Sequence, residues 1–127
     1  MLDDLSTSWS TNMKLVFFYG TLKRGHYNYE RFKEGLTFLH ESSVRGYSLV
    51  NANRYYPHAI PDVDGLVIGE VFEAEEMTAR SIEGMEVGAG YKSVLVTTES
   101  GVECTMYYSD YEGFQKLPKS SFFEKGE

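Results

Sequence analysis

The sequence predicts an α+β domain built on a small, mostly antiparallel, barrel-like β-sheet with two or more short flanking helices. A chain of 127 residues is long enough for one domain, because it can bury roughly two thirds of its unfolded surface. Aromatic residues make up 15% of the chain, including ten Tyr and eight Phe, and these residues favour strands. Five or six apolar segments accompany only two helical patterns. The regular strand–helix alternation of a parallel sheet is missing.

Runs of β-branched and aromatic residues between turn signals mark the strands. The first run, Leu15 to Tyr19, is apolar throughout and is expected to be buried on both faces. Gly46 predicts a bend or bulge, and Asn51 to Asp64, with two prolines, is expected to form a loop. The further strands are expected at residues 36–39, 44–50, 65–74, 91–98 and 102–108, the last two pairing as a hairpin around residues 99–101.

Two short helices are expected between these strands. Asn28 is placed to cap a helix through residues 30–33, which Gly35 would end. A second helix of about three turns is expected over residues 75–86, because its apolar residues form a partial stripe at helical spacing and glycines follow it. The sequence thus divides into a flexible, polar N-terminal arm at residues 1–12, a domain at 13–110, and a C-terminal segment at 111–127. That last segment is expected to pack on the domain or to be partly disordered.

Charge and cysteine content limit the partners and the compartment. Twelve basic and 19 acidic residues give a net charge of −7, which argues against binding to nucleic acid or to anionic lipid. No apolar run approaches the roughly 20 residues of a membrane-spanning helix. Cys104 is the single cysteine and the N-terminus does not resemble a signal peptide, so we expect a cytoplasmic protein. We also expect a monomer or a weak homodimer.

The turn that follows the first strand is the first candidate for a binding site. Gly20 allows the backbone to leave the strand sharply, and successive N–H groups in such a turn form a concave site for a carboxylate or an oxyanion. Lys23 and Arg24 could steer an anion, but solvated loop cations are the commoner case. The turn therefore favours a small anionic ligand.

A pair of glutamates is the second candidate. Glu83 and Glu86 lie three residues apart on one helix face, with Glu86 in the last turn. Apolar neighbours, a like charge and the negative end of a helix would all raise the pKa of Glu86 toward neutrality. A solvated acidic helix end is the competing interpretation. The three histidines and Cys104 lack the spacing of a zinc site, and no serine lies in a nucleophile motif, so we expect neither metal nor cofactor.

Four ordered blocks resemble the γ-glutamylcyclotransferase-like family, and within it the γ-glutamylamine cyclotransferase and AIG2-like branch. The blocks are Phe18-Tyr19-Gly20-Thr21-Leu22-Lys23-Arg24-Gly25, Tyr56-Pro57-His58-Ala59-Ile60-Pro61, Val67-Ile68-Gly69-Glu70-Val71-Phe72, and Ile82-Glu83-Gly84-Met85-Glu86 followed by Tyr91. The resemblance implies a small β-barrel with flanking helices. It also implies an enzyme that converts a γ-glutamyl amine or amide to 5-oxoproline and a free amine.

The resemblance also implies roles for individual residues. Glu86 would be the acid/base, and the turn of Tyr19, Gly20, Thr21 and Leu22 would hold the γ-glutamyl unit. Tyr91 would form a wall of the pocket or hydrogen-bond the substrate, although packing in the core is the commoner role of such a tyrosine. Two positions depart from many relatives, which have Gly where this chain has Val87 and Arg where it has Ser93; these departures concern substrate range.

Two other functions are compatible with the same residues. A non-catalytic module could keep the pocket and bind a small metabolite without turning it over, since a fold alone does not determine chemistry. A purely structural or protein-interaction domain is the other interpretation, but it leaves the glycine-containing turn without a function. An exposed aromatic patch from Tyr111, Phe122 and Phe123 would favour it.

Overall fold

The computed structural model of the protein describes residues 13–20, 22–51, 57–109 and 115–116. Two α-helices and a short 3₁₀ turn accompany the strands. The strands are β1 (Lys14–Phe18), β2 (Leu36–Asn51), β3 (Pro57–Ala74), β4 (Lys92–Thr97), β5 (Glu103–Tyr108) and β6 (Gln115–Lys116). The helical elements are α2 (Tyr27–Phe32), η1 (Lys33–Gly35) and α3 (Glu76–Gly88).

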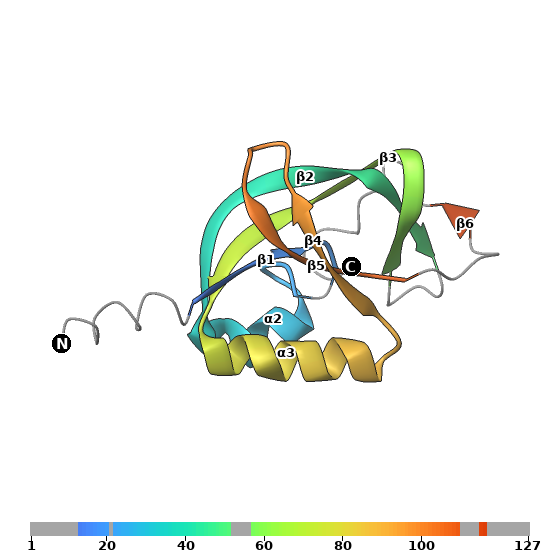
Figure 1. The fold of residues 1–127 in the computed structure, drawn as a ribbon. Coiled ribbons are helices and arrows are strands. Elements are labelled where there is room, and N and C mark those ends of the chain that lie inside the picture. Colours follow the sequence, from blue (N-terminus) through green and yellow to red (C-terminus); the bar gives the residue numbers. More distant parts are fainter. Residues whose placement is uncertain (1–12, 21, 52–56, 110–114, 117–127) are drawn as a thin grey trace.

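All six of these strands belong to one sheet, in the order β4-β5-β1-β3-β2-β6 (Figure 1). Four of the neighbouring pairs are antiparallel, and β1 pairs with β5 in parallel. The predicted α+β class and mostly antiparallel sheet are therefore confirmed. The hairpin expected around residues 99–101 is also confirmed, as β4 and β5.

The sheet curves strongly but its strand pairing is open in the described part of the chain, so the predicted barrel is not confirmed. Contacts from the β4–β5 turn bridge part of the remaining gap to β2. The Glu99 N–H donates to the Ser43 carbonyl oxygen at 2.8 Å, and the Glu99 carboxylate lies 3.1 Å from Arg45 Nε. Ser100 Oγ lies 3.0 Å from His40 Nε2. The arch of β2 and β3 that brings these residues together is visible in Figure 1.

The two long strands differ from the sequence-based expectation. Residues 36–39 and 44–50 belong to a single strand, β2, and much of the expected loop at 51–64 is the first part of β3. Register shifts between Phe38 and His40 and between Arg45 and Tyr47 let these long strands bend without ending. Gly46, with φ of 94°, lies at the second shift and confirms the predicted bulge.

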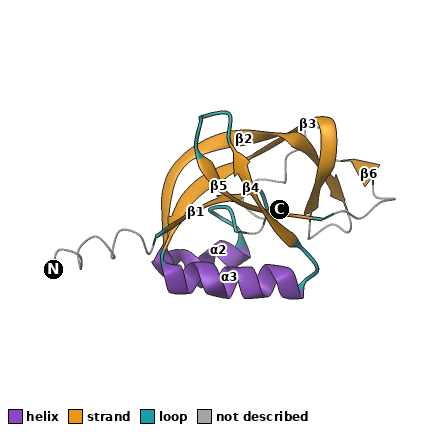
Figure 2. Ribbon diagram, in the orientation of Figure 1, coloured by secondary structure: helices purple, strands orange, loops and turns teal. Residues whose placement is uncertain are grey.

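Both helices lie on the same side of the sheet (Figure 2). Helix α3 agrees with the predicted helix to within two residues at its end, and Gly90, with φ of 100°, follows it. Helix α2 begins three residues earlier than expected. His26 occupies the N-cap position without a side-chain capping bond, so the expected cap by Asn28 is wrong.

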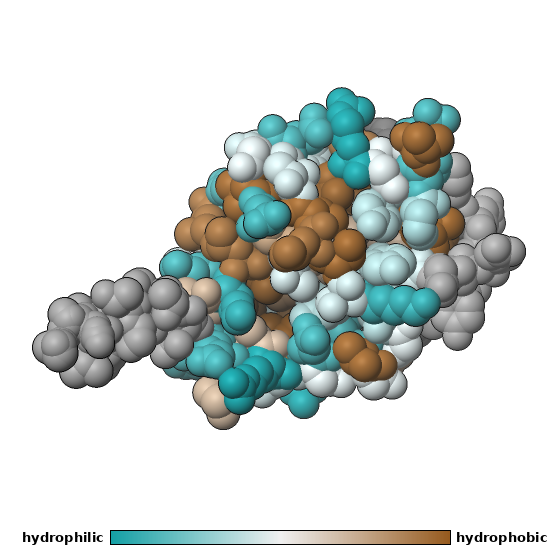
Figure 3. All heavy atoms as spheres, viewed as in Figure 1, coloured by the Kyte–Doolittle hydropathy of each residue, from teal (hydrophilic) through white to brown (hydrophobic). Residues whose placement is uncertain are grey.

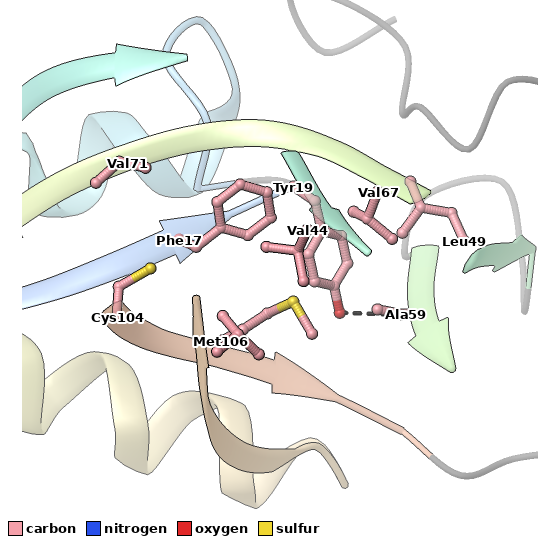
Figure 4. Close-up of a cluster of buried hydrophobic side chains, with 10 residues drawn as sticks. Phe17, Tyr19, Val44, Leu49, Ala59, Val67, Val71, Cys104 and Met106 are labelled. Carbon is pink, nitrogen blue, oxygen red and sulfur yellow. Dashed lines mark hydrogen bonds between the residues drawn. The ribbon is translucent and has the colours of Figure 1, made fainter. Parts of the chain in front are cut away.

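Apolar side chains from the two faces of β1 enter two separate cores. Phe17 joins Val44, Val71 and Met106 in a core enclosed by the curved sheet, part of which is shown in Figure 4. Val16 and Phe18 point to the opposite face, where they pack with Ile82 of α3. Burial on both faces is therefore confirmed from Val16 to Tyr19, whereas Leu15, also expected to be buried, is 36% exposed.

The outer surface is mixed. Figure 3 shows apolar atoms gathered over the strands, next to more hydrophilic surface. Among the described helices, none combines the length and the apolar character needed to cross a membrane. The expectations for the arm at 1–12 and for Tyr111, Phe122 and Phe123 concern residues outside the described part of the chain.

Candidate active site

The turn that follows β1 is held by its own backbone. The Lys23 N–H donates to the Gly20 carbonyl oxygen at 3.0 Å, and the His26 N–H donates to the Lys23 carbonyl oxygen at 3.1 Å. Gly25 has φ of 88°, a conformation that glycine adopts without strain. Leu22 is buried in the core beneath the helices. Thr21 lies outside the described residues, so the predicted donor set is described only at Tyr19, Gly20 and Leu22.

The Tyr19 side chain belongs to the core. Its hydroxyl donates to the Tyr107 carbonyl oxygen at 2.6 Å and accepts from the Ala59 N–H at 3.1 Å, the bond drawn in Figure 4. Burial raises the pKa of Tyr19 well above its usual range, and the nearby Tyr91 and Glu86 raise it further. The structure thus brings three predicted site residues, Tyr19, Glu86 and Tyr91, within electrostatic range of one another.

Glu86 lies in the last turn of α3, as predicted. It is partly buried, and loss of hydration raises the pKa of its carboxyl group from the ordinary value near 4.5 to about 7. Such a group exchanges protons at neutral pH, which is the property of a general acid/base. This partial burial differs from the full solvation that the competing interpretation of Glu86 assumes.

The turn that follows α3 brings Tyr91 back to the end of that helix. Its N–H donates to the Glu86 carbonyl oxygen at 3.0 Å. Its ring stacks on His58, with the ring centres 4.8 Å apart and the planes at 21°. Burial lowers the pKa of His58, which leaves the imidazole neutral at pH 7. The stacked pair provides a flat wall next to the helix end that carries Glu86.

Glu83 contacts a tyrosine that sequence reasoning did not single out. The Tyr107 hydroxyl donates to Glu83 Oε1 at 2.9 Å. Burial raises the pKa of Tyr107, and Glu83 and the nearby Glu86 raise it further. Both residues line a groove of about 370 Å³ between α3 and strands β1 and β5. Tyr107 therefore hydrogen-bonds one of the two glutamates that the sequence placed on one helix face and lies within electrostatic range of the other.

The expectation of two solvated loop cations is wrong for Lys23, whereas the Arg24 side chain is 42% exposed but paired. Lys23 is buried. Arg24 bonds the buried carboxylate of Glu70 on β3 through both its backbone N–H and its guanidinium group. A charged residue inside an otherwise apolar strand was a signal that a partner must exist, because a buried charge needs a partner.

Cys104 lies in the core enclosed by the curved sheet. Cys104 is buried and burial raises the pKa of its thiol to about 11, which makes it a poor nucleophile at neutral pH. Among the described residues, no group of three or more His, Cys, Asp or Glu side chains could hold a metal ion.

Comparison with known proteins identifies the family. The family model described as "Gamma-glutamyl cyclotransferase, AIG2-like" matches residues 16–126. The chain belongs to this family. The match includes the turn after β1, the end of α3 and Tyr91, so every predicted site residue falls within the part of the chain that the family shares.

Two relatives illustrate the range of this family. A protein of Pyrococcus horikoshii, provisionally named a gamma-glutamylcyclotransferase, is 36% identical over 86 residues, which cover 65% of this chain and 68% of the relative. A Niallia circulans protein named gamma-L-glutamyl-butirosin B gamma-glutamyl cyclotransferase is 35% identical over 74 residues, 58% of this chain. This match covers only 46% of the Niallia protein.

Solved structures of the family share the fold. The crystal structure of the Pyrococcus horikoshii protein is 27% identical and has a TM-score of 0.73, covering 86% of this chain and 89% of that one. An AIG2-like protein from Mus musculus, 24% identical, has a TM-score of 0.65 and covers 80% of both chains. This second likeness concerns the fold alone.

Proposed function

We propose that the protein is a γ-glutamyl cyclotransferase that converts a γ-glutamyl amine or amide to 5-oxoproline and the free amine. The observation that carries this proposal is Glu86, a partly buried carboxyl group with a pKa raised to about 7, within electrostatic range of Tyr19 and Tyr91. Its family membership supports the same reaction.

The reaction needs protons to move between two nitrogens of one substrate. The α-ammonium group first gives a proton to the Glu86 carboxylate, and the free α-amine attacks the γ-carbonyl carbon. As the tetrahedral intermediate collapses, the bond between that carbon and the leaving nitrogen breaks and Glu86 returns the proton to this nitrogen. The ring nitrogen then gives its second proton to Glu86, which passes it to the released amine. The products are therefore 5-oxoproline and the protonated amine, and Glu86 ends as a carboxylate.

The substrate supplies its own nucleophile, which is why the protein needs neither a reactive serine nor a reactive cysteine. Ring closure is intramolecular, so the attacking and attacked atoms are already joined at a favourable distance. What the protein adds is orientation, proton transfer and stabilisation of the oxyanion. In this proposal the backbone of residues 19–22 holds the γ-glutamyl unit and donates to the oxyanion.

The amine half of the substrate would lie beyond the site, against the wall formed by Tyr91 and His58. This wall is planar and neutral at pH 7, so it adds no charge that would select a charged amine. Val87 and Ser93, where many relatives have Gly and Arg, lie on either side of the turn that leads to Tyr91. We place the determinants of the leaving amine in this region.

The test is release of 5-oxoproline, measured by mass spectrometry, from a panel of γ-glutamyl amines, γ-glutamyl dipeptides and glutathione. The Glu86→Gln variant keeps the shape of the side chain and removes its proton transfer, so turnover should fall about 10²–10⁴-fold. Glu83→Gln is the matched control from the same helix face, and we expect it to retain turnover within about tenfold, because Glu83 is bonded to the Tyr107 hydroxyl and burial is what raises the pKa of Glu86.

The outcomes separate the candidate functions. Release that depends on Glu86 supports the enzyme and identifies its amine class. Binding of the panel without release by the unsubstituted protein points to a metabolite-binding module, and full activity in Glu86→Gln removes this residue from the mechanism.

A further inference from the structure

Glu70 is a buried charge in the middle of the sheet. It lies on β3 directly opposite Phe18, the last residue of β1, so it is adjacent to the point where the candidate binding turn leaves the sheet. Its side chain is only 11% exposed, and the next two residues of the strand, Val71 and Phe72, are fully buried. A carboxylate in such surroundings is costly unless several donors surround it.

Arg24 supplies those donors from within the turn. Its backbone N–H donates to Glu70 Oε1 at 2.9 Å. Its side chain donates from Nε and Nη2 to Glu70 Oε2 at 3.3 and 3.2 Å. The guanidinium group also lies over the Phe38 ring, 3.4 Å from its centre, so both its face and its edge are occupied.

Backbone hydrogen bonds and a buried side chain also hold the turn. The bonds from the N–H groups of Lys23 and His26 close the turn on itself. Leu22 fixes one side of the turn by burial in the helix-side core. The bond from the Arg24 backbone to Glu70 fixes the other side to β3, in which Gly69, the residue before Glu70, lies against the Phe18 carbonyl.

We propose that Glu70 is a positioning residue, which acts through Arg24 to orient the backbone donors of the turn toward the substrate. The inference rests on the proposed function in that the turn is the γ-glutamyl subsite. It also gives the Arg24 charge a structural role: the guanidinium group pairs with Glu70 and with the more distant Glu41, at 3.8 Å, and does not bind the carboxylate of the substrate.

The matched pair of variants is Glu70→Gln and Glu41→Gln. Both remove one carboxylate that faces the same guanidinium nitrogen, but the Glu41 side chain is 73% exposed, and it is Glu70 that accepts from the Arg24 backbone N–H. Glu70→Gln keeps an oxygen acceptor for the Arg24 N–H and loses the charge that holds the guanidinium group. We expect kcat/KM to fall about tenfold or more in Glu70→Gln and to change less than about twofold in Glu41→Gln.

Three readouts distinguish positioning from general loss of structure. The midpoint of the pH profile of kcat/KM, which reports Glu86, should be unchanged in Glu70→Gln, and far-ultraviolet circular dichroism should show an intact fold. Arg24→Gln should lower activity similarly, and the double variant should be no worse than either single one, because both substitutions remove the same ion pair. Arg24→Lys keeps the charge but loses the planar fork of donors, so its kcat/KM should lie between that of Arg24→Gln and that of the unsubstituted protein.

A second measurement does not depend on turnover. Amide hydrogen exchange at Leu22 to Gly25 should be faster in Glu70→Gln than in Glu41→Gln or the unsubstituted protein. If the unsubstituted protein releases no 5-oxoproline, the proposed reaction fails while the exchange data still report the turn. Equal exchange and equal kcat/KM in the two variants would overturn the positioning role, and so would a shifted pH midpoint, which would place Glu70 at the proton-transfer step.

Discussion

The raised pKa of Glu86 has a cost in stability that can be measured apart from activity. Burial favours the neutral form of the carboxyl group, so the folded state binds this proton more tightly than the unfolded chain does. Between the ordinary value near 4.5 and about 7, the folded state therefore holds more protons than the unfolded state. By linkage, stability decreases as pH rises through this window and then stays at the lower level.

The magnitude follows from the shift. A displacement from 4.5 to about 7 corresponds to about 3 kcal/mol of unfolding free energy lost above pH 7. Glu86→Gln substitutes a neutral group of the same shape that does not titrate. The variant should therefore be nearly as stable as the unsubstituted protein at pH 5 and more stable at pH 8, with the difference growing by about 2–3 kcal/mol.

Urea unfolding at pH 5, 6, 7 and 8, followed by circular dichroism, measures this difference directly. Glu34→Gln removes an exposed carboxylate and controls for the loss of one negative charge. A difference between Glu86→Gln and the unsubstituted protein that does not change with pH would refute the burial argument. A pH dependence shared by Glu34→Gln would assign the effect to net charge. The expected result is a variant that gains stability as it loses catalysis, which is a known trade-off at active sites.

Two further predictions concern the sheet. Gly69→Ala would place a Cβ 2.4 Å from the Phe18 carbonyl oxygen and should destabilise the protein by about 2–3 kcal/mol, measured by urea unfolding. Gly84→Ala is the control in α3, where a Cβ meets open space, and this variant should be neutral or stabilising by up to about 1 kcal/mol. Ser100→Ala removes the hydroxyl that contacts His40, Ser42 and Thr98, and should lower the urea midpoint by an amount equivalent to about 1 kcal/mol; an unchanged midpoint would show that the bridge to β2 does not stabilise the curved sheet.

Local patterns predicted the strands with distinct borders and failed where two long strands bend. The prolines at 57 and 61 suggested a loop because proline removes a backbone donor. In the structure Pro57 is the first residue of β3, and Pro61 pairs with Tyr47 beside the Gly46 bulge, two positions that tolerate proline in a sheet. Only the partner strand reveals this, so the sequence of one segment could not.

In the candidate site, too, local sequence patterns identified some residues and missed those that depend on distant partners. Glu86 was found because helical spacing, the end of the helix and the family motif all indicate it. Glu70 and Tyr107 were missed because their importance depends on partners 46 and 24 residues away in sequence, Arg24 and Glu83. The expected barrel was inferred from strand composition, which cannot show whether the two edges of a curved sheet pair.

The position of β1 between β3 and β5 has a consequence for how the chain folds during synthesis. Of the described strands, β1 is the earliest to leave the ribosome; it is central in the sheet, and its parallel neighbour β5 is completed only at Tyr108. Until then one edge of the apolar strand Val16–Phe18 has no partner, and an unpaired apolar edge invites pairing with other chains. Fragments that end before β5 should therefore aggregate, and the nascent chain depends on the last hairpin to protect its first strand.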